Sequence, residues 1–173
     1  MSRLRRLVLS DRYFFVTCNR QRTRPALGDQ DFEILARVIA ARREEQGFLL
    51  TAWVFLPDHW HAILALRRPK TVSQVMESIK VASTRRVNRH QKASGRLWQG
   101  RFFDRALRTV KEYYETVKYI HFNPVRRGLV KTPGAWKWSS VHEYAPLGGR
   151  PAFGAPSLTI DRVRIPADPR ARI

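Results

Sequence analysis

Two histidines separated by a single residue, His59 and His61, are the first feature of this sequence that could carry chemistry. They open the apolar run 59–66, which is typical of a strand, and residues two apart on a strand point to the same face. Both imidazoles could therefore bind one metal ion from a rigid support. The alternative, that they are ordinary histidines at the start of a strand, stays open on this spacing alone.

A tyrosine and an asparagine four residues apart, Tyr119 and Asn123, form a second pair. On a helix that turns about 100° per residue they lie together, away from the apolar stripe of Tyr113, Val117 and Ile120. The amide oxygen could complete a metal site while the phenolic oxygen attacks a substrate held there. A packed tyrosine, with an asparagine that merely ends the helix, is the open alternative.

The elements that must position these groups are predicted from apolar periodicity and end signals. Strands are expected over 12–18, 49–56, 59–66 and 98–107, and helices over 30–46, about 72–89 and 110–122. Capping boxes at Thr71 and Thr109 open the last two helices. We expect Gly47 to end the first helix and Asn123-Pro124 to stop the third.

This order places helices between strands without the regular alternation of a doubly wound fold. It predicts an α+β fold, a ferredoxin-like sandwich with an antiparallel sheet and helices on one face. A chain of 173 residues has apolar material for one cored domain, which we assign to 1–145. The segment 146–173 holds five of the ten prolines and three of the nine glycines, and we expect a loose or strapped-on tail there.

The charge balance points to an anionic partner. The 33 Lys and Arg residues against 14 Asp and Glu residues give a net charge of +19, which favours nucleic acid. Part of this charge gathers at the end of the second helix, at Arg85, Arg86 and Arg89. An ordinary solvated helix face is the alternative interpretation of that cluster.

Other classes of protein are excluded by what the sequence contains. The longest apolar runs, such as 48–56, fall short of the roughly 20 residues that a spanning helix needs. The N-terminal arginines are followed by too short an apolar stretch for a signal peptide, so a cytoplasmic protein is expected. The single cysteine, Cys18, excludes an internal disulfide and a zinc site built from several cysteines, and we interpret it as a small strand hydrophobe.

Four segments in one collinear order, between about Arg12 and Tyr144, resemble the REP-associated tyrosine transposases, which are single-tyrosine HUH endonucleases. The segments are Leu56–His61 (LPDHWH), Leu97–Phe102 (LWQGRF), Tyr119–Val130 (YIHFNPVRRGLV) and Trp138–Ser140 (WSS).

The resemblance implies a domain that cleaves and rejoins single-stranded or hairpin DNA at palindromic repeats, as a monomer or a homodimer associated with the nucleoid. On the matching positions it implies that Tyr119 is the nucleophile and that His59, His61 and Asn123 bind a divalent metal, Mg²⁺ or Mn²⁺. The product would be a 5′-phosphotyrosine and a free 3′-hydroxyl. Contacts with DNA are expected from basic and aromatic side chains, namely Arg85, Arg86, Arg89, Trp98, Arg101, Arg126 and Arg127.

The sequence also departs from the family pattern. The family often has Asn before the first histidine and a Leu-Asn-Pro-Val-Arg-Ala-Gly run, whereas this chain has Asp58, Phe122 and Arg127 at three of those positions. Asp58 is interpreted as a turn residue or as a partner of a histidine ring. His121 is interpreted as a surface or phosphate-contacting residue. A nucleic-acid binder that has lost catalysis, and a metal nuclease that uses water, are the competing functions.

Overall fold

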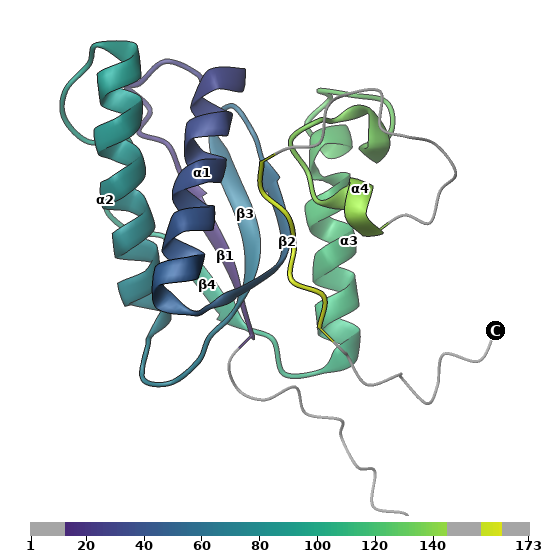
Figure 1. The fold of residues 1–173 in the computed structure, drawn as a ribbon. Coiled ribbons are helices and arrows are strands. Elements are labelled where there is room, and N and C mark those ends of the chain that lie inside the picture. Colours follow the sequence, from purple (N-terminus) through teal and green to yellow (C-terminus); the bar gives the residue numbers. More distant parts are fainter. Residues whose placement is uncertain (1–12, 145–156, 164–173) are drawn as a thin grey trace, which may run out of the picture.

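The computed structural model describes residues 13–144 and 157–163 (Figure 1). The N-terminal arginines and most of the predicted tail lie outside the described residues. Within those ranges, no helix combines the length and the apolar character that crossing a bilayer would require.

The core of the molecule is a four-stranded antiparallel sheet with the order β2-β3-β1-β4. The strands are β1 (Tyr13–Asn19), β2 (Leu49–Phe55), β3 (His59–Ala65) and β4 (Phe103–Ala106). The helices are α1 (Asp29–Gln46), α2 (Val72–Gln91) and α3 (Val110–Arg126), followed by a 3-10 turn (Pro133–Ala135) and the short α4 (Val141–Tyr144). This strand-helix order and sheet order are ferredoxin-like, which confirms the predicted α+β fold.

The helices cover both faces of the sheet, so the expectation that they lie on one face was wrong. Figure 1 shows α1 and α2 side by side against one face, with α3 against the other. The reason lies in β2 and β3, which are buried on both faces and therefore need two apolar covers. Trp53 and Trp60 pack in the α1/α2 core, whereas Val54 and Ile63 pack against α3.

The helices begin and end at residues that are favoured as helix caps. The hydroxyl of Thr71 accepts from the Gln74 amide (3.3 Å), and the Gln74 side chain accepts from the Thr71 amide (3.0 Å), which confirms that capping box. Gly47 ends α1 with a φ of 69°, a conformation that glycine adopts without strain. The hydroxyl of Thr109 accepts from the amide of Glu112 (3.1 Å) and opens α3. The Glu112 carboxylate accepts from the Arg108 amide (2.7 Å) and not from the Thr109 amide, so the predicted capping box forms only in part.

The predicted strand 98–107 is shortened to Phe103–Ala106. The carbonyls of Gln99 and Gly100 accept hydrogen bonds from the ammonium group of Lys80 on α2, at 2.7 and 2.8 Å. Those carbonyls are therefore turned away from a strand ladder. Trp98 keeps one isolated bridge, to Arg20 beyond the end of β1.

The third helix does not stop at Asn123-Pro124 as predicted but continues to Arg126. Proline lacks an amide hydrogen, and in the last turn of a helix this removes only one intrahelical bond. The turn beyond it is still closed, because the Arg127 amide donates to the Asn123 carbonyl (3.0 Å) and the Leu129 amide donates to the Pro124 carbonyl (2.9 Å).

The described part of the tail, 157–163, runs along the outer strand β2 (Figure 1, yellow). The Asp161 amide donates to the Leu50 carbonyl (2.7 Å), and the Leu50 amide donates back to the Asp161 carboxylate (2.9 Å). Leu158 is buried in the α1/α2 core. This segment therefore covers hydrogen-bonding groups at an edge of the sheet.

Candidate active site

Strand β3 presents both histidines to the face of the sheet that α3 covers. His59 and His61 are buried, and they alternate with Trp60, whose ring packs in the α1/α2 core on the opposite face. Their Nε2 atoms lie 3.1 Å apart. The predicted convergence of the two imidazoles is therefore present in the structure.

The other ring nitrogen of each histidine has its own partner, and this fixes which nitrogen faces the site. Nδ1 of His59 lies 2.6 Å from a carboxylate oxygen of Asp58, which can only accept, so Nδ1 carries the hydrogen. Nδ1 of His61 lies 2.8 Å from the hydroxyl of Thr17 on β1, which stands directly opposite His61 in the strand register. Nε2 of each ring is thereby directed to the same point.

Burial keeps these imidazoles neutral. It lowers the pKa of His61 to about 3, with a further contribution from His59, and it lowers the pKa of His59 although Asp58 opposes that shift. Burial alone would raise the pKa of Asp58. The hydrogen bond from His59 and the nearby charge of Arg127 hold that pKa below its usual value instead. Neutral imidazole is the form that binds metal ions.

Asn123 on α3 completes this group of polar atoms. Its amide nitrogen lies 3.1 Å from Nε2 of His61, and its Oδ1 is buried without a hydrogen-bond partner. A carboxamide presents its oxygen in place of its nitrogen after a half turn. Two imidazole nitrogens and an amide oxygen form a donor set that a divalent cation accepts, so these residues fit the metal that the sequence implied. In the described part of the chain, no three His, Cys, Asp or Glu side chains gather into a metal-binding group.

Tyr119 lies next to the histidines and outside the core. Its ring centroid is 5.4 Å from that of His61 and 5.8 Å from that of Phe15, and 37% of its surface is exposed. The stripe predicted to be buried is buried, at Tyr113, Val117 and Ile120. The guanidinium of Arg126 lies 5.2 Å above the Tyr119 ring. An exposed phenol beside a polar donor set is suited to attack on a phosphate from solution.

A small pocket beside Tyr119 was not predicted from the sequence. It is lined by Phe15, Phe103, Arg105, Glu115, Thr116 and Tyr119. Arg105 is held there by a hydrogen bond to the hydroxyl of Thr116 (3.3 Å), and Phe103 exposes about half of its surface. The residues come from β1, β4 and α3, so strand pairing and the packing of α3 on the sheet bring them together. Thr17 was missed for the same reason.

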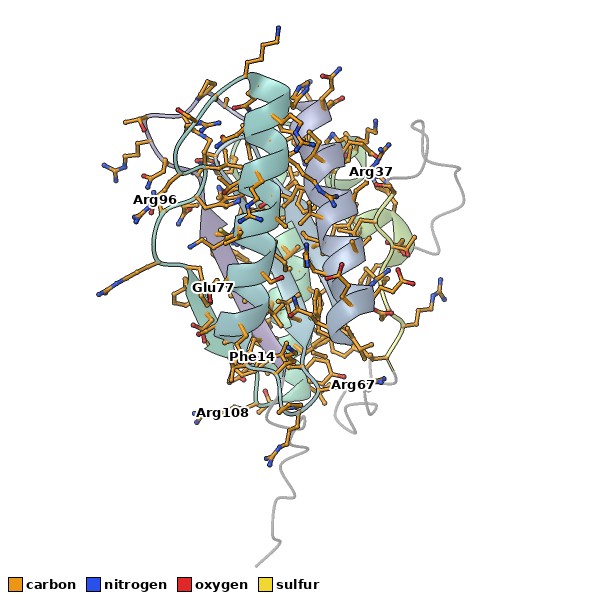
Figure 2. All side chains as sticks on the ribbon, turned by 60° about the vertical axis from the view of Figure 1, so that its left-hand side comes forward. Phe14, Arg37, Arg67, Glu77, Arg96 and Arg108 are labelled. Atoms are coloured by element: carbon orange, nitrogen blue, oxygen red, sulfur yellow. The ribbon has the colours of Figure 1, made fainter. Side chains whose placement is uncertain are left out.

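The predicted DNA contacts fall into two groups. Arg126 and Arg127 are exposed at the end of α3, close to the site, whereas Arg85, Arg86 and Arg89 are exposed on α2, in the other layer. Arg101 is exposed in the segment before β4. Figure 2 shows the α2 side, with Glu77 on the helix and Arg96 on the loop that follows it. A groove between them includes Lys80, Arg85 and Arg96 in its lining.

Two expected surface roles were wrong. Trp98 is only 3% exposed, and its indole N–H donates to the hydroxyl of Ser83 (2.8 Å), so it belongs to the core beneath the groove and cannot stack on a base. His121 is 6% exposed, bonds the hydroxyl of Ser140 (3.0 Å) and packs against Tyr144. It is buried because segment 139–144 covers that side of α3.

Comparisons with known proteins show which family and which fold this chain shares. The model of the family described as "Transposase IS200 like" matches residues 8–123. The chain is 31% identical over 160 residues to the REP-associated tyrosine transposase of Escherichia coli (strain K12), covering 92% of this chain and 94% of that relative. It is also similar to a solved structure of a REP-associated tyrosine transposase bound to a REP hairpin. That similarity has a TM-score of 0.70 and 28% identity, and it covers 95% of this chain and 100% of the other.

Proposed function

The chain belongs to the IS200-like transposase family, and on that premise we propose that it cleaves and rejoins single-stranded or hairpin DNA at palindromic repeats through a covalent bond to Tyr119. The observation that carries the proposal is the meeting of four side chains from two elements. His59 and His61 come from β3, and Tyr119 and Asn123 come from α3.

In this reaction the phenolic oxygen of Tyr119 attacks a backbone phosphorus and loses its proton. The bond from phosphorus to the 3′ oxygen breaks, and that oxygen leaves as a hydroxyl. The DNA downstream of the cut stays attached to Tyr119 through its 5′ phosphate. Because one phosphoester replaces another, a later attack by a 3′-hydroxyl can rejoin DNA without an external source of energy.

We propose that His59, His61 and Asn123 hold a divalent metal, Mg²⁺ or Mn²⁺. When bound, such an ion neutralises charge on the scissile phosphate and on the departing oxygen. The chain's own contribution is rigid placement. Asp58 and Thr17 orient the two rings, and α3 sets the position of Tyr119 relative to Asn123.

Hairpin DNA is the proposed partner, since a relative of known structure is bound to a REP hairpin. The net charge of +19 suits the contact with its phosphates. We assign this contact to Arg126 and Arg127 beside the site, to Arg101 before β4, and to three arginines on α2, namely Arg85, Arg86 and Arg89. Because one chain supplies all four site residues, either a monomer or a homodimer can carry a complete site.

The test is a denaturing gel of two end-labelled versions of one REP-type hairpin incubated with the protein and Mg²⁺ or Mn²⁺. The 3′-end label should move into a slow, SDS-resistant and protease-sensitive band. The 5′-end label should appear in a shorter free strand, and EDTA should prevent both changes. An oligonucleotide of the same composition that cannot form the stem is the matched control.

The same gel separates the competing functions. A nuclease that uses water would release both labels in free fragments and no band of bound protein. A protein that only binds DNA would leave both labels in full-length strands. Either result would refute covalent strand transfer.

A further inference from the structure

The side chain of Asp58 joins two parts of the site that come from different elements. One carboxylate oxygen accepts a hydrogen bond from Nδ1 of His59 (2.6 Å), and the other forms an ion pair with the guanidinium of Arg127. Asp58 lies in the turn between β2 and β3, whereas Arg127 directly follows the last residue of α3. The pair therefore connects the strand that carries the histidines to the helix that carries Tyr119 and Asn123.

The contacts around this pair form a closed ring of hydrogen bonds that begins and ends at Asp58. The backbone amide of Arg127 donates to the carbonyl of Asn123 (3.0 Å), and the Asn123 side chain lies 3.1 Å from Nε2 of His61. That nitrogen lies 3.1 Å from Nε2 of His59, whose other nitrogen bonds Asp58. Each residue of this ring is therefore held by two neighbours.

We propose that Asp58 and Arg127 are a positioning pair for the proposed metal and DNA site. Asp58 holds His59 in the tautomer with hydrogen on Nδ1, so that the lone pair of Nε2 points towards His61 and Asn123. Arg127 holds the carboxylate in the orientation that makes this bond. The pair acts through His59 and does not touch the substrate's reacting atoms, and the inference rests on the proposed function of that site.

Two observations favour positioning over a simple surface ion pair. Both side chains are about half exposed, and ion pairs in such places contribute little to folding stability. The same carboxylate also bonds the ring of His59, which a simple surface ion pair would not do. The ion pair is therefore part of the hydrogen bonding that holds His59.

The tautomer of His59 is the direct readout, and it is measured without metal or DNA. Nitrogen-15 NMR of the histidine rings in the full chain should show His59 with hydrogen on Nδ1. Asp58→Ala should move a large part of His59 to the other tautomer, whereas Asp58→Asn, whose amide oxygen still accepts, should preserve the original one. Arg37→Ala, which breaks the exposed pair with Glu33, is the matched control and should change nothing.

Binding of Mn²⁺ alone, measured by electron paramagnetic resonance, gives the second readout. Asp58→Ala should raise the dissociation constant about 10- to 100-fold, as loss of a ligand's outer partner commonly does. Arg127→Ala should raise it less. The double variant should bind no more weakly than Asp58→Ala, because Arg127 acts through Asp58.

An unchanged His59 tautomer in a folded Asp58→Ala protein would overturn the proposal. So would single effects that multiply in the double variant, since independent residues behave in that way. If Asp58→Ala does not fold, Mn²⁺ binding by Arg127→Ala that equals the wild-type binding would refute the proposal equally. Failure of the covalent chemistry at Tyr119 would show on the denaturing gel and would leave the tautomer unchanged, so the two claims can fail separately.

Discussion

The two faces of strand β3 differ in what they bury. Trp60, Ala62 and Leu64 enter the apolar core beneath α1 and α2, whereas His59 and His61 face α3. Both sets are almost free of solvent contact. Alternation along one strand has thus placed one face wholly in an apolar core, while the other face holds two polar side chains at fixed positions next to the apolar Ile63.

Substitutions on the two faces of β3 should therefore have different effects on stability and on activity. On the α1/α2 face, a smaller side chain removes apolar contact and leaves a cavity, so stability should fall while the chemistry of the folded protein persists. On the α3 face, a substitution that keeps the shape should leave stability nearly unchanged and remove activity. Substitutions on the two faces test this separation.

The largest effect is expected from Tyr119→Phe. The ring contacts with Phe15 and His61 are kept, so stability should change by less than about 0.5 kcal/mol, which is usual for an exposed position. Without the phenolic oxygen, cleavage should fall by about 10³-fold or more. Tyr114→Phe, on the same helix at 51% exposure, is the control and should cleave normally. Cleavage by Tyr119→Phe at the wild-type rate would show that Tyr119 is not the nucleophile.

The opposite behaviour is expected from Leu64→Ala on the α1/α2 face. Leu64 is fully buried, and its truncation should lower the free energy of unfolding by about 2–5 kcal/mol. Denaturant titration measures that loss. Below the new unfolding transition, the cleavage rate per folded molecule should equal that of the wild type. A large loss of rate in the folded protein would show that the two faces are coupled.

A graded effect is expected at Asn123, which is buried on the α3 face. Asn123→Ala removes the amide and should raise the Mg²⁺ or Mn²⁺ concentration needed for half-maximal cleavage about tenfold, in line with the loss of one ligating group. Asn123→Asp keeps an oxygen at the same reach and should need less metal than Asn123→Ala. Identical metal titrations for the wild type and both variants would show that Asn123 does not bind the metal.

The smallest effect is expected from His121→Gln, because this buried polar residue lies on α3 but bonds Ser140 and none of the proposed metal ligands. Burial lowers the pKa of His121 to about 4, below the value of about 6.5 in an unfolded chain. As pH falls from 6.5 to 4, the unfolded state binds a proton that the folded state does not, and stability falls by up to about 1.4 kcal/mol per pH unit.

His121→Gln removes this titration, so urea unfolding should show a smaller loss of stability over that pH range. Cleavage at neutral pH should stay the same. If the variant loses stability with acid as steeply as the wild type, another group is responsible.

The sequence predicted the parts of the site that depend on local periodicity. Strand alternation put His59 and His61 on one face, and helical spacing put Tyr119 off the buried stripe of α3. Both follow from backbone geometry over a few residues. The four-stranded ferredoxin-like sheet followed from the order of the elements.

The failures share a different cause, which is packing between segments distant in the sequence. Trp98 was predicted to contact DNA from its motif, but its indole N–H donates to Ser83 on α2 and its ring is buried in the core. The bond of His121 to Ser140 and the pairing of Thr17 with His61 across two strands also depend on contacts between distant segments. Helices on both faces could have been expected because apolar residues in β2 and β3 occupy consecutive positions, as in Trp53–Phe55 and Ala62–Ala65, and do not alternate with polar ones.

The central claim is that Tyr119, beside the two histidines, forms the covalent bond to DNA. Peptide mapping by mass spectrometry of the protein–DNA adduct, after digestion of both protein and DNA, tests it most directly. We expect the peptide containing Tyr119 to carry a nucleotide through its 5′ phosphate, and Tyr114 on the same helix to carry none. A nucleotide on Tyr114 or on any other residue, or attachment through a 3′ phosphate, would contradict it.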